Sequence, residues 1–246
     1  MCTLAIAWRV FEDAPVVAAA NRDEAFDRPS DPPVVLQRDP PVIAPRDREA
    51  GGTWIGLRGD GRFVAITNRW DGPRDGERSR GLLVRDALLA ETTGEVLEGV
   101  ETAVTSEGYA GFNLLVADDE SAEWFAWNGE LRRRSFEPGL HVLVNVGADG
   151  SYRLPPDRRA AGRRQAESAE AVRTALDPDG IDGASAWLDR AATVLADHDV
   201  GACVHGDGFG TRSSSLVRTG RTPTYRFADG PPCRTPYRSV PLEGHD

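Results

Sequence analysis

Hydrophobic and polar residues alternate along the first part of the chain in the way that β-strands require. Residues 3–8 and 15–20 predict two strands, joined by a polar turn at residues 12–14. A second hairpin is predicted by residues 53–57 and 62–68, because a Gly-Asp-Gly turn separates two further apolar runs. The chain therefore opens on antiparallel β-structure.

Between these hairpins lies a segment rich in proline and arginine. Residues 28–50 contain six prolines. Because proline has no backbone N–H to donate, we expect a loop here, without a helix or a central strand. Residues 71–77 are rich in Gly, Asp and Arg and predict a second loop.

Helical periodicity begins after the second loop. Ser79 is suited to cap a helix whose Leu82, Leu83, Ala87 and Leu88 share one face, and an amphipathic helix follows near residues 94–104. The rest of the chain repeats this order of strands and helices. We expect a meander of strands at residues 112–117, 123–127, 131–136 and 140–145, helices at 158–176 and 184–196, and strands at 213–217 and 224–227.

The order of these elements predicts the fold class. Strands and helices follow one another in blocks, which is typical of segregated layers and not of βαβ alternation. We therefore expect an α+β protein with two antiparallel sheets facing each other and helices outside them. Neither a repeat nor a linker divides the sequence, so we interpret residues 1–246 as a single domain.

Composition and charge narrow the partners and the location. No run approaches the ~18 apolar residues of a membrane-spanning helix. Residues 18–20 look like a signal-peptidase site, but Arg9, Glu12 and Asp13 interrupt the apolar stretch before it, so we expect a cytoplasmic protein. The net charge is −10, and every basic residue is arginine. Surplus carboxylates repel phosphate backbones, so we expect no nucleic-acid partner, while the oligomeric state stays open.

The cysteines and histidines raise the question of a disulfide or a metal. Cys2, Cys203 and Cys233 are too few for a disulfide framework, although a Cys203–Cys233 bridge is an alternative to free thiols. His198, Cys203 and His205 lie close together in the sequence, beside several aspartates. Their spacing matches no strong zinc pattern and no second cluster completes it, so we expect neither a metal nor another cofactor.

Cys2 is chemically unusual because of its position. If Met1 is removed, this residue carries both a thiol and a free α-amine. The amine has an ordinary pKa of about 7.7–8.0, against about 8.5 for a thiol. It is therefore a weak base beside a nucleophile, which satisfies the usual need for an activating group without a histidine. The alternative is that Cys2 is a small buried residue at the start of a strand.

Short motifs along the chain resemble one protein family. They occur in order from residue 1 to about 217: Met1-Cys2-Thr3-Leu4, Asn21-Arg22-Asp23-Glu24 with Arg28-Pro29, Gly51-Gly52-Thr53-Trp54-Ile55-Gly56, Thr67-Asn68, Ser79-Arg80-Gly81, Gly111-Phe112-Asn113-Leu114 and Gly210-Thr211-Arg212-Ser213. Together they resemble the NRDE family, the family of the transport and Golgi organisation 2 protein. That resemblance implies the four-layer αββα fold of N-terminal-nucleophile hydrolases.

The resemblance also implies a set of site residues. In the similar cysteine amidohydrolases the nucleophile matches Cys2, and an aspartate that contacts the amine matches Asp23. The oxyanion donors match Asn68 and Asn145, and a late arginine matches Arg212. From the residues themselves we expect two substrate-binding side chains. Arg22 is placed to pair with a substrate carboxylate or with Glu24, and Trp70 is expected to line a pocket.

These residues and the resemblance are compatible with two functions. The first is a cysteine hydrolase that cleaves an amide bond of a small or lipid-like molecule. The second is a non-catalytic carrier that reuses the fold, because relatives in the transport and Golgi organisation 2 family have been connected with haem and lipid handling. In both cases the expected partner is a small molecule.

Overall fold

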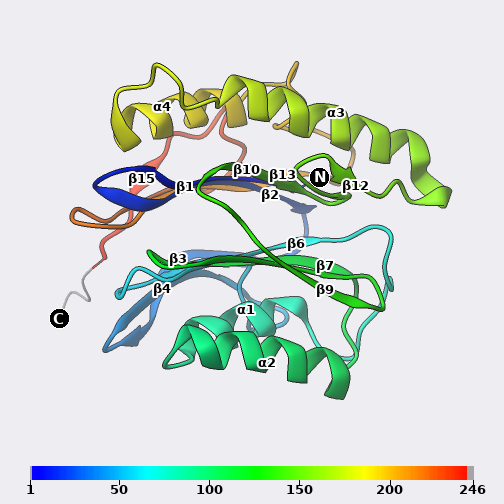
Figure 1. Cartoon of the computed structure of the whole chain (residues 1–246). Helices are drawn as coiled ribbons and strands as arrows, with labels where there is room; N and C mark the ends of the chain where they lie inside the picture. Colours follow the sequence, from blue (N-terminus) through cyan, green and yellow to red (C-terminus); the bar gives the residue numbers. More distant parts are fainter. Residues whose placement is uncertain (1, 243–246) are drawn as a thin grey trace.

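Two antiparallel sheets lie face to face between two helical layers in the computed structural model of the chain, which describes residues 2–242 (Figure 1). One outer layer contains α3 and α4 and the other contains α1 and α2. The helices are α1 (Arg80–Leu89), α2 (Thr93–Ser106), α3 (Arg159–Ala175) and α4 (Gly183–Leu195), with a 3-10 turn at Pro156–Arg158. The expected fold class, an α+β protein with an αββα arrangement of layers, is confirmed.

The sheet beneath α3 and α4 has eight strands. Their order is β12-β11-β10-β1-β2-β13-β14-β15. The bounds are β1 (Thr3–Phe11), β2 (Ala14–Ala25), β10 (Gly139–Val144), β11 (Gly147–Ala148), β12 (Ser151–Tyr152), β13 (Phe209–Arg218), β14 (Thr224–Ala228) and β15 (Arg238–Ser239). We call this the first sheet. Its first two strands pair with strands from much later in the chain, β1 with β10 and β2 with β13.

The second sheet has seven strands in simple sequence order, β3-β4-β5-β6-β7-β8-β9. The bounds are β3 (Ser30–Arg38), β4 (Pro41–Asp47), β5 (Ile55–Arg58), β6 (Phe63–Asn68), β7 (Phe112–Ala117), β8 (Ala122–Trp127) and β9 (Leu131–Ser135). Helices α1 and α2 cover its outer face.

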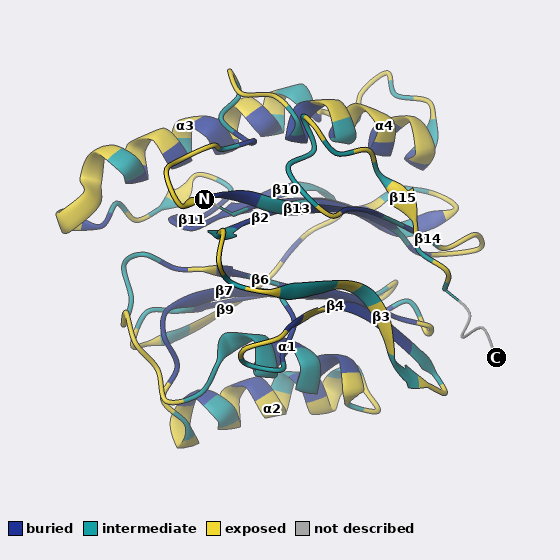
Figure 2. Ribbon diagram, turned by 180° about the vertical axis from the view of Figure 1, so that it is seen from behind, coloured by how far each residue is buried: buried dark blue, intermediate teal, exposed yellow. Residues whose placement is uncertain are grey.

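Three apolar cores hold the layers together. The central core lies between the sheets and contains Leu4 and Ile6 from the first sheet and Phe63 and Leu115 from the second. A second core joins the first sheet to α3 and α4 and includes the fully buried Trp187. A third core joins the second sheet to α1 and α2. Figure 2 shows the result, with buried residues along the inner faces of the layers and exposed residues on the outer faces of the helices.

Local signals predicted most of the helices and strands correctly. Ser79 caps α1 by accepting a hydrogen bond from the backbone nitrogen of Gly81. The second helix begins with a capping box between Thr92 and Glu95, which satisfies two backbone donors at its N-terminus. No helix within residues 2–242 is both long and apolar enough to cross a membrane.

The expected loop at residues 28–50 is wrong, because β3 and β4 form there. The sheet tolerates these prolines by position. Pro32 and Pro33 lie on β3, an edge strand whose register shifts between Asp31 and Val34, and Pro41 is the first residue of β4. At an edge, a bulge or a strand start, a missing backbone N–H removes no hydrogen bond of the ladder.

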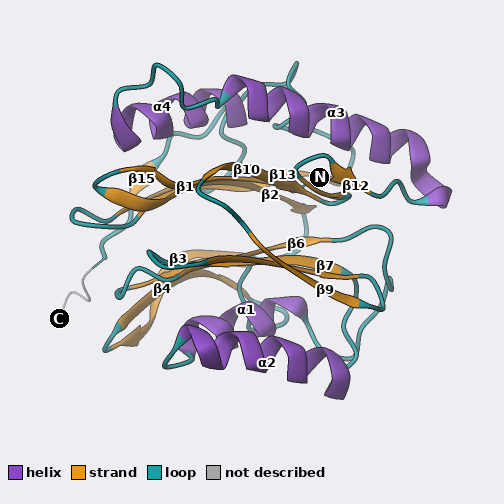
Figure 3. Cartoon of the chain, viewed as in Figure 1, coloured by secondary structure: helices purple, strands orange, loops and turns teal. Residues whose placement is uncertain are grey.

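The expected meander is also wrong in its last strand. The strands at residues 112–117, 123–127 and 131–135 are neighbours in the second sheet, but β10 pairs with β1 in the first sheet. The chain after β9 crosses from one sheet to the other (Figure 3). The last four residues of β10 are all buried, because the strand is covered on both faces. A fully buried strand carries no periodic signal that identifies its partner.

A buried asparagine connects the two sheets through their shared interior. The Nδ2 atom of Asn113, on β7, donates to the carbonyl of Val144 on β10 and to Oγ1 of Thr67 on β6, at 3.0 and 3.1 Å. Its Oδ1 accepts from Arg69 Nη1 at 2.8 Å and from Trp124 Nε1 at 3.3 Å. These hydrogen bonds satisfy groups that have no access to water.

We therefore expect Asn113→Ala to lower the free energy of unfolding by about 2–3 kcal/mol, because it leaves several buried polar groups without partners. Urea unfolding measures this change. Asn128→Ala is the matched control, since Asn128 is only partly buried and its side chain makes one hydrogen bond, to Asp71. Equal losses in the two variants would contradict the role given to Asn113.

Candidate active site

Cys2 lies immediately before β1, between the ends of two neighbouring strands. In the register of the sheet Thr3 pairs with Asn21 on β2 and with Val144 on β10. Cys2 is half-buried, and its thiol donates to the backbone carbonyl of Asp23 with an Sγ–O distance of 3.7 Å. The first hairpin therefore returns the segment around Asp23 to the start of the chain.

Asn145, directly after β10, holds the backbone of Cys2. Its Oδ1 accepts a hydrogen bond from the Cys2 nitrogen at 2.9 Å. Its Nδ2 donates to the carbonyl of Asn68, at the end of β6, at 2.8 Å. The backbone nitrogen of Asn145 donates to Oε1 of Gln165 on α3, also at 2.8 Å. Asn145 thus joins the first sheet, the second sheet and a helix at the position of Cys2.

Asp23 is buried beside Cys2. Its Oδ1 accepts a hydrogen bond of 2.6 Å from Oγ1 of Thr211, which faces it across the β2–β13 pair. Burial raises the pKa of the Asp23 carboxyl above its ordinary value. Burial also raises the pKa of the Cys2 thiol. A thiol in this environment is less ionised at neutral pH than a free cysteine, so it depends on a base for activation.

A cleft opens beside Cys2 between the two sheets. The sequence-predicted residues Cys2, Arg22, Asp23 and Asn68 line it. It holds about 80 Å³ of space for solvent. This volume admits a small functional group, whereas pockets for drug-sized ligands hold roughly 300–1,000 Å³. A larger cavity of about 300 Å³, lined by Pro15 and Pro41 among others, lies at the other end of β1 and β2 and contains no cysteine.

Paired charges line one side of the cleft. The guanidinium of Arg22 stacks over the ring of Trp54, with 4.1 Å from its Cζ to the centroid. Arg22 also lies 3.5 Å from Glu24 and 3.6 Å from Asp47. Asp47 forms a closer ion pair with Arg28, at 2.7 Å. The expected Arg22–Glu24 pair is therefore present, and Arg22 is held by packing as well as by charge.

Arg80, at the start of α1, was not predicted as a site residue but lines the same cleft. Its Nη1 donates to the carbonyl of Gly111 at 2.8 Å. Within residues 2–242 it forms an ion pair with no carboxylate. Burial lowers the pKa of Arg80, which nevertheless stays cationic near neutrality. Its place in the Ser79-Arg80-Gly81 motif was the only signal for it.

Three predicted residues do not line the cleft: Asn145, although it contacts Cys2, and Trp70 and Arg212. Trp70 packs against the core beneath α3 and α4, with Arg158 over its ring. The tryptophan that lines the cleft with Cys2 is Trp54 instead. Arg212 lies at a bulge of β13, between the pairings of Thr211 and Ser213 with β2. The bulge interrupts the alternation of side chains, so the position of Arg212 along the strand did not predict its surroundings. Its role in catalysis stays a prediction.

Solved structures identify the class of fold to which this chain belongs. The chain matches the N-acylethanolamine-hydrolyzing acid amidase ortholog of Caenorhabditis elegans with a TM-score of 0.55 over 87% of this chain and 92% of that one. It matches a mutant conjugated bile acid hydrolase of Clostridium perfringens with a TM-score of 0.56 over 100% and 95% of the two chains. Sequence identity is 13% in both cases. The fold is that of the N-terminal-nucleophile hydrolases.

The sequence itself identifies the family. A family model described as Transport and Golgi organisation 2 matches residues 1–229, and the chain belongs to this family. The human Transport and Golgi organization protein 2 homolog is 27% identical over 234 aligned positions, which cover 82% of this chain and 81% of that protein. The Mus musculus homolog is 31% identical over 143 positions, covering 53% of this chain and 50% of its own length.

The raised pKa of the Cys2 thiol predicts slow alkylation in protein that retains Met1. A raised pKa means less thiolate at pH 7, so we expect iodoacetamide to modify Cys2 more slowly than the cysteine of an unfolded peptide with the same first residues. The rate should approach that of the peptide only as the pH rises above the ordinary thiol pKa of about 8.5. Peptide mapping by mass spectrometry gives both rates. Equal rates at pH 7 would contradict this expectation.

Proposed function

We propose that this chain is a cysteine N-terminal-nucleophile hydrolase that cleaves an amide bond of a small or lipid-like molecule. One observation carries the proposal: the nitrogen and the thiol of Cys2 are both held at the end of a cleft that also contains Asn68 and Asp23. Removal of Met1 converts that nitrogen into an α-amine. The base that the buried thiol requires is then part of the same residue.

The reaction proceeds through an acyl-enzyme. The α-amine of Cys2 takes the thiol proton, and the sulfur attacks the carbonyl carbon of the amide. The C–N bond of the resulting tetrahedral intermediate breaks as the α-ammonium returns the proton to the departing amine. Water then attacks the thioester, with the α-amine as base, and releases a carboxylic acid and the free thiol. The hydrogen bond from this nitrogen to Asn145 fixes where the base lies.

Asn68 is the better-placed donor for the oxyanion. Its side chain is exposed in the cleft, whereas the amide of Asn145 already contacts Cys2 and the Asn68 backbone. Asn145 therefore acts first as a positioning residue, with one amide hydrogen left for an oxyanion. Asp23 orients the amine. Arg22 and Arg80 are the cations available for an anionic or carbonyl group of the substrate.

The size of the cleft and its surroundings support a small or lipid-like amide. About 80 Å³ suits the reacting amide group, and the remainder of the molecule has to lie outside. Phe26 and Phe209 are both 42% exposed where β2 ends and β13 begins, near Asp23. They offer an apolar surface to the rest of the substrate. One structural relative is an N-acylethanolamine-hydrolyzing amidase, which supports the same substrate class.

Substitution of Cys2 and Asn68 tests the mechanism. With a panel of N-acyl amides of increasing acyl length, we expect Cys2→Ala to abolish hydrolysis. Asn68→Ala should lower kcat about 10²–10³-fold, as the loss of one oxyanion donor does elsewhere. Asn128→Ala is the control and should leave kcat unchanged. Wild-type protein quenched during turnover should carry the acyl group on the Cys2 peptide.

Unaltered turnover in Cys2→Ala would falsify the proposal. The carrier alternative makes a different prediction. A haem carrier shifts the Soret band of haem on titration, and it does so without hydrolysing any amide of the panel.

The mechanism also requires a processed N-terminus. We expect the intact mass of the native protein to correspond to a chain that starts at Cys2, because the amine does not exist while Met1 is attached. A native mass that includes Met1 rules out the α-amine as the base.

A further inference from the structure

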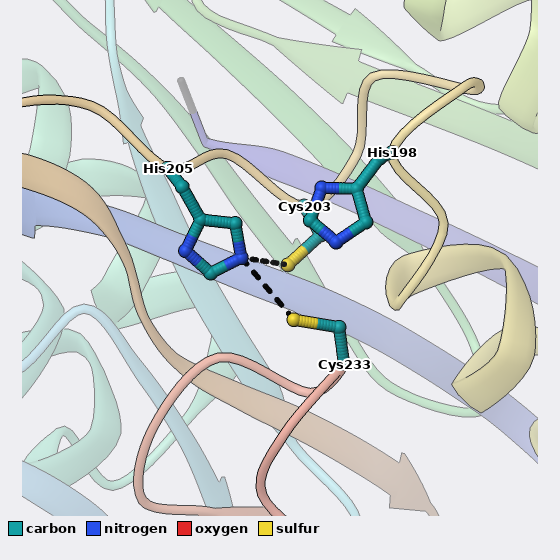
Figure 4. A group of neighbouring side chains, drawn as sticks. All are labelled: His198, Cys203, His205 and Cys233. Carbon is teal, nitrogen blue, oxygen red and sulfur yellow. Dashed lines mark hydrogen bonds between the residues drawn. The ribbon is translucent and has the colours of Figure 1, made fainter.

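Four potential metal ligands converge near the start of β13, apart from the cleft (Figure 4). His198, Cys203 and His205 come from the loop between α4 and β13, and Cys233 comes from the segment between β14 and β15. One ligand atom from each side chain lies within 4.8 Å of all the others. Sequence spacing does not connect Cys233 with the other three residues, because 27 residues separate it from His205.

The distances fit a tetrahedral centre. The Nε2 atom of His205 lies 3.7 Å from Sγ of Cys203 and 3.2 Å from Sγ of Cys233. The rings of His198 and His205 stack with their centroids 5.0 Å apart. In a tetrahedral zinc site with Zn–S of about 2.3 Å and Zn–N of about 2.0–2.1 Å, neighbouring donor atoms lie roughly 3.3–3.8 Å apart. A small inward movement of the side chains is enough to close the site.

We propose that His198, Cys203, His205 and Cys233 bind a zinc ion. Two thiolates neutralise the charge of a divalent cation, and two sulfur and two nitrogen donors are the combination that favours zinc over magnesium or calcium. The set supplies four protein ligands and leaves no position open for substrate, so the centre is structural. A disulfide between Cys203 and Cys233 would use only two of the four residues, and both cysteines are free thiols here.

The zinc ion would fasten two loops to each other and to the base of the cleft. The residues on both sides of Cys203 already form hydrogen bonds with β2 and β13. The carbonyl of Ala202 accepts from Nδ2 of Asn21 at 2.9 Å, and the nitrogen of Val204 donates to Oγ1 of Thr211 at 2.9 Å. The same Thr211 hydroxyl donates to Asp23. The proposed site therefore fixes the loop that supports Asp23, whether or not the chain is a hydrolase.

Metal analysis of the full-length protein tests the proposal. Protein purified without a polyhistidine tag should contain about one zinc ion per chain by elemental mass spectrometry. Cys233→Ser should lose most of this zinc, and Cys233→His, which restores a ligand, should regain it. Cys2→Ser is the matched control, because it removes a thiol outside the cluster, and it should keep the metal. Circular dichroism establishes that each variant is folded.

Removal of the metal from the wild-type protein gives an independent readout that needs no variant. A chelator should lower Tm and expose the thiols of Cys203 and Cys233 to alkylation. Added zinc should reverse both changes. Cobalt in place of zinc should produce the visible absorption of a tetrahedral thiolate site.

Three results would overturn the zinc site. The first is wild-type protein that contains no zinc, even after dialysis against the metal. The second is an equal loss of zinc in Cys2→Ser and Cys233→Ser. The third is a Cys203–Cys233 disulfide in the native protein, detected as a linked peptide that only a reductant separates.

Discussion

The cleft depends on one amide side chain, that of Asn145, at the place where the two sheets meet. This side chain binds the nitrogen of Cys2 in one sheet and the carbonyl of Asn68 in the other. The backbone of the same residue is bound to α3 through Gln165 and to the backbone of Trp70. A buried amide with all these partners is satisfied in only one arrangement of the layers. The two sheets are therefore held at a defined separation where the nucleophile lies.

The sequence predicted the elements whose causes are local. A capping serine, a Gly-Asp-Gly turn and alternating apolar positions each act within a few residues, and the elements they predicted are present. Pairing between distant strands has no such local cause. The strand β10 is buried on both faces and was assigned to the wrong sheet. The prolines of β3 and β4 were acceptable only because of their positions in a sheet. The blocks of strands and helices were nevertheless sufficient to predict the layers.

The site residues also fall into two groups, those with a local sequence signal and those brought together only by the fold. Cys2, Asp23 and Asn68 belong to short motifs at the ends of strands, so the pairing of β1 with β2 and the contact of β6 with Asn145 bring them together. Arg80 and Trp54 lie in motifs of the same family, but no feature of the sequence assigned them a side of the cleft. Arg212 also lies in such a motif, and Trp70 in none, but neither side chain lines the cleft. Cys233 joins its three neighbours only through the fold, since the β13–β14 hairpin folds the chain back to them.

The absence of lysine gives the nitrogen held by Asn145 a property that is rare in a protein of this size. Once Met1 has been removed, the α-amine of Cys2 is the only primary amine among the remaining residues, because all 29 basic side chains are guanidinium groups. An amine-selective reagent therefore reports on this one atom. Its rate of modification as a function of pH gives the microscopic basicity of the N-terminus directly, without isotopic labelling and without interference from the surface of the protein.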